Sequence, residues 1–122
     1  VCYRAQCLKS TAAVVERLGL QPEQYAISFQ SRLGPEKWLT PTTENELERM
    51  AREGVQRMLV VCPAFVSDCL ETLEEIGIRG KEDFTSWGGE SLELIPCMNQ
   101  HPIWIDALKQ MIGTWAAKRD AA

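Results

Sequence analysis

The sequence lacks long apolar runs, clustered basic residues and cysteine pairs spaced as CxxC, and each absence excludes a class of protein. Its longest strongly apolar run, residues 58–62, is far too short to cross a bilayer. A net charge of −4 with scattered lysines and arginines does not suit a phosphate backbone, so we expect no nucleic-acid partner. These absences predict a protein that is soluble or attached only peripherally to a membrane.

Cysteine and histidine are present without an obvious metal-binding spacing. The five cysteines stand at positions 2, 7, 62, 69 and 97. An odd, scattered set is typical of reduced thiols in the cytosol rather than of a secreted disulfide framework. The single histidine, His101, precedes Pro102, and we interpret it as a structural or capping residue.

The length of 122 residues allows one modest core, which predicts a single small α/β or α+β domain. The chain has no initiator methionine and begins inside a predicted helix, so we expect further sequence upstream.

Helix and strand signals alternate along the chain. In the first half, they predict a helix over 3–18, a strand over 25–29, a loop over 31–42 and a helix over 43–53. In the second half, they predict a strand over 58–62, a helix from Ser67 or Asp68 to Ile76, a loop over 77–89 with room for one turn of helix, a strand over 92–95 and a terminal helix from 103 onwards. Thr43 and Glu46 form a capping box for the second helix. On the terminal helix, Trp104, Met111 and Trp115 form an apolar stripe that predicts a core face.

This alternation predicts a thin, three-stranded parallel sheet wound by crossover helices. The continuous apolar run at 58–62 predicts a strand buried on both faces. In such folds, binding sites form just beyond the carboxyl ends of the strands. Here those positions are residues 30–38 and 63–75.

Carboxylates crowd the helix predicted after residue 67. Asp68, Glu71 and Glu75 have the i, i+3 and i+7 spacing that places side chains on one helix face. One interpretation is that these acids complement the helix dipole and lie in solvent. The other is that they bind a hard or borderline cation, or accept protons, at a raised pKa.

An aromatic residue stands in the other candidate segment. Trp38 follows Gly34 and Pro35, which stiffen the loop after the predicted strand at 25–29. This Trp is either a wall for a flat apolar ligand or a cover for the edge of the sheet.

Together these segments resemble ferrochelatases, the enzymes that insert Fe²⁺ into a porphyrin to make haem. The residues that carry the resemblance are Tyr3, Gln6, Gln30, Ser31, Gly34, Pro35, Trp38, Leu39, Phe65, Asp68, Glu71, Thr72, Leu73, Glu75, Asn99 and Pro102. The most specific element is Phe-x-x-Asp-x-x-Glu-Thr-Leu, from Phe65 to Leu73.

The resemblance implies a three-layer, chelatase-like α/β fold with a short, mostly parallel sheet flanked by helices. It identifies residues 1–122 as a C-terminal ferrochelatase domain truncated on its N-terminal side, without the first strand and the N-terminal domain. We therefore expect an unpaired sheet edge that takes the N-terminal half of the enzyme or a second copy as partner. The fragment alone is expected to be inactive.

The resemblance also implies roles for individual residues, with Fe²⁺ as the substrate metal and protoporphyrin IX as the tetrapyrrole. Glu71 and Asp68 match catalytic residues, and Glu71 with Glu75 matches the metal-binding acids. Trp38, Phe65, Gln30 and Ser31 match the porphyrin-binding residues. The family's catalytic histidine lies upstream of this chain. In the family, the acidic helix often contains a π-type irregularity, which would change the direction of the Glu71 side chain.

Some features depart from the family or leave alternatives open. Cys69 stands where animal members have a histidine, so it is a softer metal ligand or no ligand. Some members carry a [2Fe–2S] cluster in a C-terminal extension, whereas we expect free thiols here. We expect a cytoplasmic protein, with peripheral contact to the inner membrane as an option. The alternatives are a non-catalytic, porphyrin- or partner-binding chelatase-like domain, and a cobalt- or sirohydrochlorin-type chelatase, which usually relies on paired histidines.

Overall fold

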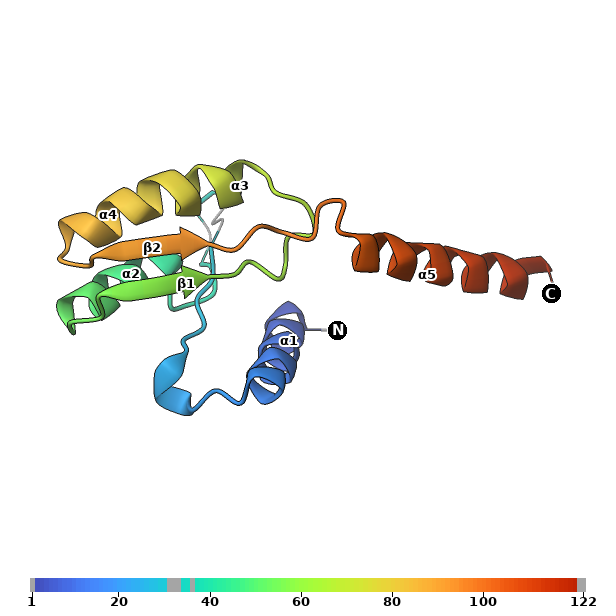
Figure 1. Ribbon diagram of the computed structural model, residues 1–122, viewed down its shortest axis with the longest axis horizontal. Coiled ribbons are helices and arrows are strands. Elements are labelled where there is room, and N and C mark those ends of the chain that lie inside the picture. Colours follow the sequence, from blue (N-terminus) through green and yellow to red (C-terminus); the bar gives the residue numbers. More distant parts are fainter. Residues whose placement is uncertain (1, 31–33, 36, 121–122) are drawn as a thin grey trace.

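A computed structural model describes residues 2–30, 34–35 and 37–120 (Figure 1). Its elements follow in the order α1 (Tyr3–Leu18), a 3₁₀ turn η1 (Pro22–Gln24), α2 (Thr43–Arg52), β1 (Arg57–Val60), α3 (Leu70–Leu73), a π-helical segment η2 (Glu75–Gly80), α4 (Lys81–Ser86), β2 (Ser91–Leu94) and α5 (Pro102–Asp120).

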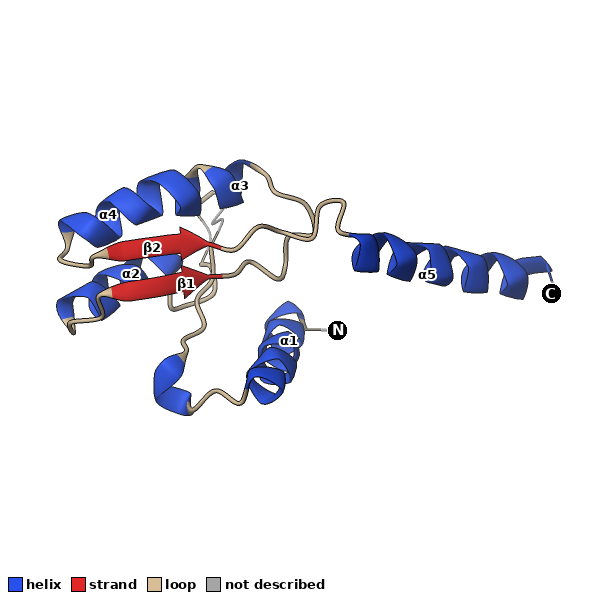
Figure 2. Cartoon of the chain, in the orientation of Figure 1, coloured by secondary structure: helices blue, strands red, loops and turns tan. Residues whose placement is uncertain are grey.

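The two strands pair in parallel, with Arg57 opposite Ser91 and Val60 opposite Leu94. The continuous helical run α3–η2–α4 connects them, and η2 and α4 both contact β2 (Figure 2). The predicted α/β class with a short parallel sheet flanked by helices is confirmed.

A small core lies between this helical run, α2 and the sheet. Its buried side chains are Leu47, Ala51, Ile76, Phe84 and Leu92. Phe84 has no exposed surface, and burial of a side chain of this size contributes about 1.5–3 kcal/mol. Trp87 and Cys62 pack against the cluster from its rim.

The prediction of a strand over residues 25–29 is wrong. Only Phe29 is bridged: its N–H donates to the Pro41 carbonyl at 2.9 Å, and its own carbonyl accepts from the Thr43 N–H at 3.2 Å. A strand needs a partner along several residues, and residues 25–28 have none. Within the described ranges the sheet therefore has two strands instead of three.

The expectation that the strand at 58–62 is buried on both faces is also wrong. Met58 and Val60 are half-buried, whereas Leu59 is 67% exposed and Val61 is 52% exposed. Exposure alternates because helices cover only one face of the sheet. The other face is open, and it carries the charged Arg57 and Glu93 beside the apolar Leu59 and Val61.

The loop predicted over 77–89 is helical as far as Ser86. Four glycines and many polar residues suggested a loop, but the chain continues from α3 through η2 into α4. The Glu74 carbonyl accepts both the Ile78 N–H at 3.2 Å and the Arg79 N–H at 2.9 Å, where α bonding changes to π bonding. The π-type irregularity expected in this helix is thus present.

The capping box predicted from Thr43 and Glu46 is wrong. The N-cap of α2 is Thr42, whose hydroxyl accepts the Asn45 N–H at 3.3 Å. The Thr43 hydroxyl instead lies 3.0 Å from that of Ser28.

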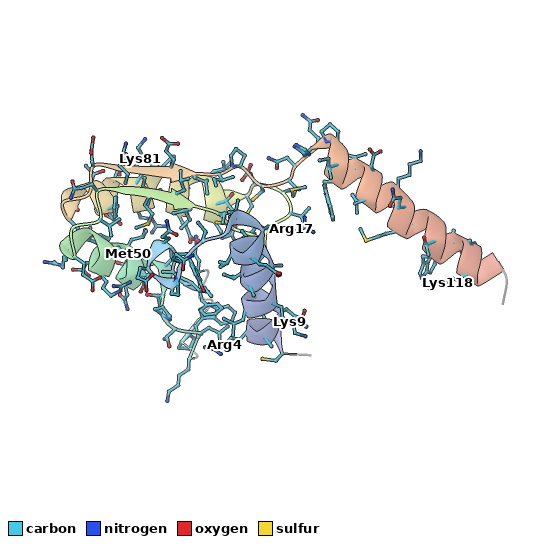
Figure 3. The ribbon with its side chains drawn as sticks, turned by 60° about the horizontal axis from the view of Figure 1, so that its bottom comes forward. Arg4, Lys9, Arg17, Met50, Lys81 and Lys118 are labelled. Atoms are coloured by element: carbon cyan, nitrogen blue, oxygen red, sulfur yellow. The ribbon has the colours of Figure 1, made fainter. Side chains whose placement is uncertain are left out.

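The terminal helices stand away from the sheet (Figure 1). α1 ends at Gly19, which takes the left-handed conformation as predicted for a glycine after a helix. α5 projects from the body, and Figure 3 shows Lys118 near its far end, well away from Met50 on α2. The prediction that one face of α5 belongs to the core is wrong, because no described element packs along this helix. Trp115, for example, is 65% exposed. None of the described helices is long and apolar enough to span a membrane.

Gly89 provides a test of the core. A Cβ at this position would lie 2.1 Å from the Phe84 ring, so Gly89→Ala should displace that ring and cost about 1–3 kcal/mol of unfolding free energy. Gly113→Ala is the matched control, because nothing lies within 4 Å of a Cβ there and alanine favours a helix. Chemical denaturation of both variants would measure the difference, and equal stabilities would contradict the packing described.

Candidate functional site

The two segments singled out from the sequence meet beyond the carboxyl end of the sheet. The Gln30 side-chain nitrogen donates to the Glu71 backbone carbonyl at 2.5 Å and to Glu75 Oε2 at 2.6 Å. These bonds join positions 41 and 45 residues apart in the sequence. The loop segment and the acidic helix therefore belong to one site.

Trp38 is attached to the same junction. Its indole N–H donates to the Gln30 carbonyl at 2.9 Å, and its ring centroid lies 6.4 Å from that of Tyr3 on α1. Trp38 as a whole residue remains 42% exposed. A cavity of about 380 Å³ opens here, and it is lined by Cys2, Tyr3, Arg4, Lys37, Trp38 and Leu39. A half-exposed aromatic beside an open cavity can contact a flat ligand.

Asp68 lies just before the helix rather than on its acidic face. Its Oδ2 accepts the Asn99 amide at 2.6 Å, while its Oδ1 accepts the Thr72 hydroxyl at 3.1 Å and the Cys97 N–H at 3.2 Å. Its own N–H donates to Asn99 Oδ1 at 2.9 Å. We call this set the Asp68–Asn99 clasp. The expected i, i+3, i+7 row of acids is therefore reduced to Glu71 and Glu75, because Cys69 is the N-cap of α3.

The clasp keeps Asp68 ionised. Hydrogen bonds from Asn99 above all, and then from Cys97 and Thr72, hold the pKa of Asp68 below its usual range. The sequence indicated Thr72 only as part of the resemblance, without a role; this side chain is fully buried, and its hydroxyl also accepts the Cys69 N–H at 3.0 Å. A possible signal was its position four residues after an acid at a helix start.

Glu71 does not have the raised pKa that one interpretation of the acidic helix required. A hydrogen bond from the Cys69 side chain, together with its own backbone N–H, lowers the pKa of Glu71 below the usual value. Glu71 is therefore a carboxylate at neutral pH, the form that binds a metal ion.

Glu75 completes the pair in the first turn of η2. Its Oε2 accepts from Gln30, and its Oε1 lies 3.9 Å from the Arg79 guanidinium. Within the part of the chain that the structure describes, no group of three or more His, Cys, Asp or Glu side chains is arranged to hold a metal ion. The carboxylates of this site thus form a pair rather than a complete ligand set.

The sequence also singled out Phe65, Ser31 and His101. Phe65 is half-buried on the segment between β1 and α3, and its N–H donates to the Cys62 carbonyl at 3.0 Å. Ser31 lies outside the described residues. His101 is exposed at the start of α5, where its carbonyl accepts from the Trp104 and Ile105 N–H groups. This arrangement is consistent with the structural role expected for His101.

All five cysteines are free thiols. Burial, and then the hydrogen bond and charge of Asp68, raise the pKa of Cys97 to about 11. Burial also raises the pKa of Cys62. The protonated thiol is thus the favoured form of these two side chains at neutral pH.

Comparison with known proteins identifies relatives for nearly the whole chain. The sequence model of the ferrochelatase family matches residues 1–115. A ferrochelatase of Ectopseudomonas mendocina (strain ymp) is 61% identical over 108 residues, which cover 88% of this chain and 32% of that protein. Ferrochelatases of Pseudomonas aeruginosa (strain LESB58) and Opitutus terrae (strain DSM 11246 / JCM 15787 / PB90-1) are each 55% identical, covering 95% and 93% of this chain and 34% and 33% of theirs. The chain spans about a third of the length of these curated relatives.

The clasp predicts a pH dependence of stability. Because Asn99 lowers the folded-state pKa of Asp68, its stabilising effect is complete above the unfolded pKa of about 3.9 and is lost as pH falls through the lower folded value. Asn99→Gly removes the amide while tolerating the φ of 45° at this position. Its melting temperature should lie below that of the parent at pH 7, and the gap should narrow below pH ~4.

Thermal melts followed by circular dichroism from pH 7 to pH ~2.5 would measure this gap. Asn45→Ala on the exposed side of α2 is the control. A gap for Asn99→Gly that stayed constant with pH would show that the clasp does not depend on the Asp68 charge.

Proposed function

Because the chain belongs to the ferrochelatase family, we propose that it forms one wall of a site at which Fe²⁺ is inserted into protoporphyrin IX to give protohaem. The observation that carries this proposal is the pair of Gln30 hydrogen bonds to Glu71 and Glu75. They join an acidic helix to a segment that presents an exposed aromatic ring, Trp38. A flat, metal-accepting ligand needs both features.

The porphyrin ring would lie against the aromatic residues. Trp38 offers a half-exposed face beside an open cavity, and Phe65 precedes the acidic helix. Stacking against aromatic faces suits a flat, apolar macrocycle and leaves its centre accessible to side chains from one side.

The acidic helix would carry the chemistry at the centre of the ring. Insertion of Fe²⁺ forms bonds from iron to the pyrrole nitrogens and releases two protons. An ionised Glu71 can bind the incoming Fe²⁺ or accept a pyrrole proton. Its lowered pKa favours the role of metal ligand, because a weak base holds a proton poorly. Glu75, on the next turn, would bind the metal before or after Glu71.

The chain alone is not expected to complete the reaction, because a single wall does not enclose a porphyrin. The remainder of a full-length ferrochelatase is the partner that we propose for the open face of the sheet, where Leu59 and Val61 are exposed. Burial of those side chains would contribute to the association.

Glu71→Gln tests the proposed role in a chimera in which this chain replaces the matching third of the Ectopseudomonas mendocina relative. The substitution keeps the side-chain shape and removes the charge, so the rate of iron insertion should fall by about 10²–10⁴-fold. Anaerobic loss of porphyrin fluorescence would measure the rate. Glu82→Gln, at an exposed position of α4, should retain the rate of the parent. Unchanged insertion with Glu71→Gln would refute the assignment.

Trp38→Ala tests porphyrin binding apart from metal chemistry in the same chimera without metal. Loss of the aromatic face should weaken porphyrin binding by roughly tenfold, measured from the Soret band during titration. Trp115→Ala, at an exposed position of α5, is the control. Equal affinities for the Trp38→Ala variant and its parent would remove Trp38 from the porphyrin site. A parent chimera that binds porphyrin without inserting iron would favour the non-catalytic alternative.

A further inference from the structure

The Gln30 amide makes two of the shortest hydrogen bonds at the site. Its nitrogen lies 2.5 Å from the Glu71 carbonyl oxygen and 2.6 Å from Glu75 Oε2. Both bonds are partly buried, and the second is assisted by the charge of the carboxylate. Such bonds are roughly twice as strong as those between neutral groups, so this contact holds the helix firmly.

The chemistry of the partners fixes which end of the amide faces the helix. A carbonyl and a carboxylate only accept hydrogen bonds, so the amide nitrogen must point toward both of them. An amide nitrogen carries two hydrogens, and these two partners take both. Both N–H groups of the Gln30 side chain are thus used within the protein.

The backbone around Gln30 is fixed independently of its side chain. The preceding residue, Phe29, is 6% exposed and bonded to Pro41 and Thr43 on either side of the bridge. The Gln30 carbonyl accepts the Trp38 indole N–H at 2.9 Å. Gln30 therefore connects two parts of the site: its main-chain carbonyl binds Trp38, which we call the aromatic wall, and its side chain binds the acidic helix.

We propose that Gln30 is a positioning residue that holds Glu71 and Glu75 at a set distance from the aromatic wall formed by Trp38. The proposal rests on the proposed function and adds to it a means of aligning the metal-binding carboxylates with the bound ring. Gln30 acts through the Glu71 backbone and the Glu75 carboxylate and does not itself contact the reacting atoms.

Gln30→Met tests the proposal in the chimera, because methionine keeps the length of the side chain and removes both donors. Misplaced carboxylates should raise KM for Fe²⁺ by roughly tenfold, as expected for loss of a charge-assisted bond. KM for the porphyrin should stay within about twofold, since the aromatic wall is held by the main chain. Gln110→Met, at an exposed position of α5, should leave both constants unchanged.

The opposite pattern of changes in the two KM values would overturn the proposal. A raised porphyrin KM with an unchanged Fe²⁺ KM would identify Gln30 as a porphyrin contact. No change in either constant would show that the two hydrogen bonds do not position the carboxylates.

Hydrogen exchange in the chain itself tests the contact without any catalysis. Gln30→Met should speed exchange of the η2 backbone amides by roughly tenfold, while the β1 and β2 amides exchange as in the parent. Equal exchange rates in η2 for Gln30→Met and the parent would show that the Gln30 hydrogen bonds do not hold this segment. Iron insertion that survives Glu71→Gln would instead refute the proposed function and leave the exchange result standing, so the two failures are distinguishable.

Discussion

The spacing of the buried residues along one helical run constrains the rest of the structure. Between Leu70 and Ser86, the chain buries Thr72, Ile76, Gly80 and Phe84, each four positions after the last. In an α-helix, positions four apart drift by about 40° around the axis per step, so such a row would turn away from the core. The wider π turn of η2 counteracts this drift. Glu71 and Glu75 each stand one position before a buried residue of this row.

This spacing also explains which parts of the fold could be predicted. The bounds of α1 and the presence of α2, β1 and β2 followed from local apolar patterns and glycine stops, which depend on near neighbours in sequence. The continuation of the helix past Gly77 did not, because a 3.6-residue period does not describe a π segment. Likewise, no local pattern distinguishes an apolar strand with one open face, as at Leu59, from one covered on both faces.

The site was predictable as a set of residues but not as a set of contacts. The order and spacing of Gln30, Trp38 and Glu71 indicated the family. The contact between Gln30 and the helix joins residues more than forty positions apart, and no short-range pattern encodes such a bond. Asp68 shows why contacts could not be predicted. Its spacing in the sequence predicts the first acid of a helix face, yet in the structure it accepts a hydrogen bond from the distant Asn99 amide and belongs to the clasp.

The Asp68–Asn99 clasp has a mechanical consequence for the terminal helix. Asn99 precedes α5 by only three residues, so the clasp is the pivot from which this 19-residue helix departs. An arm of that length extends about 28 Å, and a rotation of ten degrees at its base would carry the tip about 5 Å sideways. The direction of Trp115 and its apolar neighbours therefore depends on the contacts at the start of α5, which are the clasp and the hydrogen bond from the Asn99 N–H to the Val66 carbonyl.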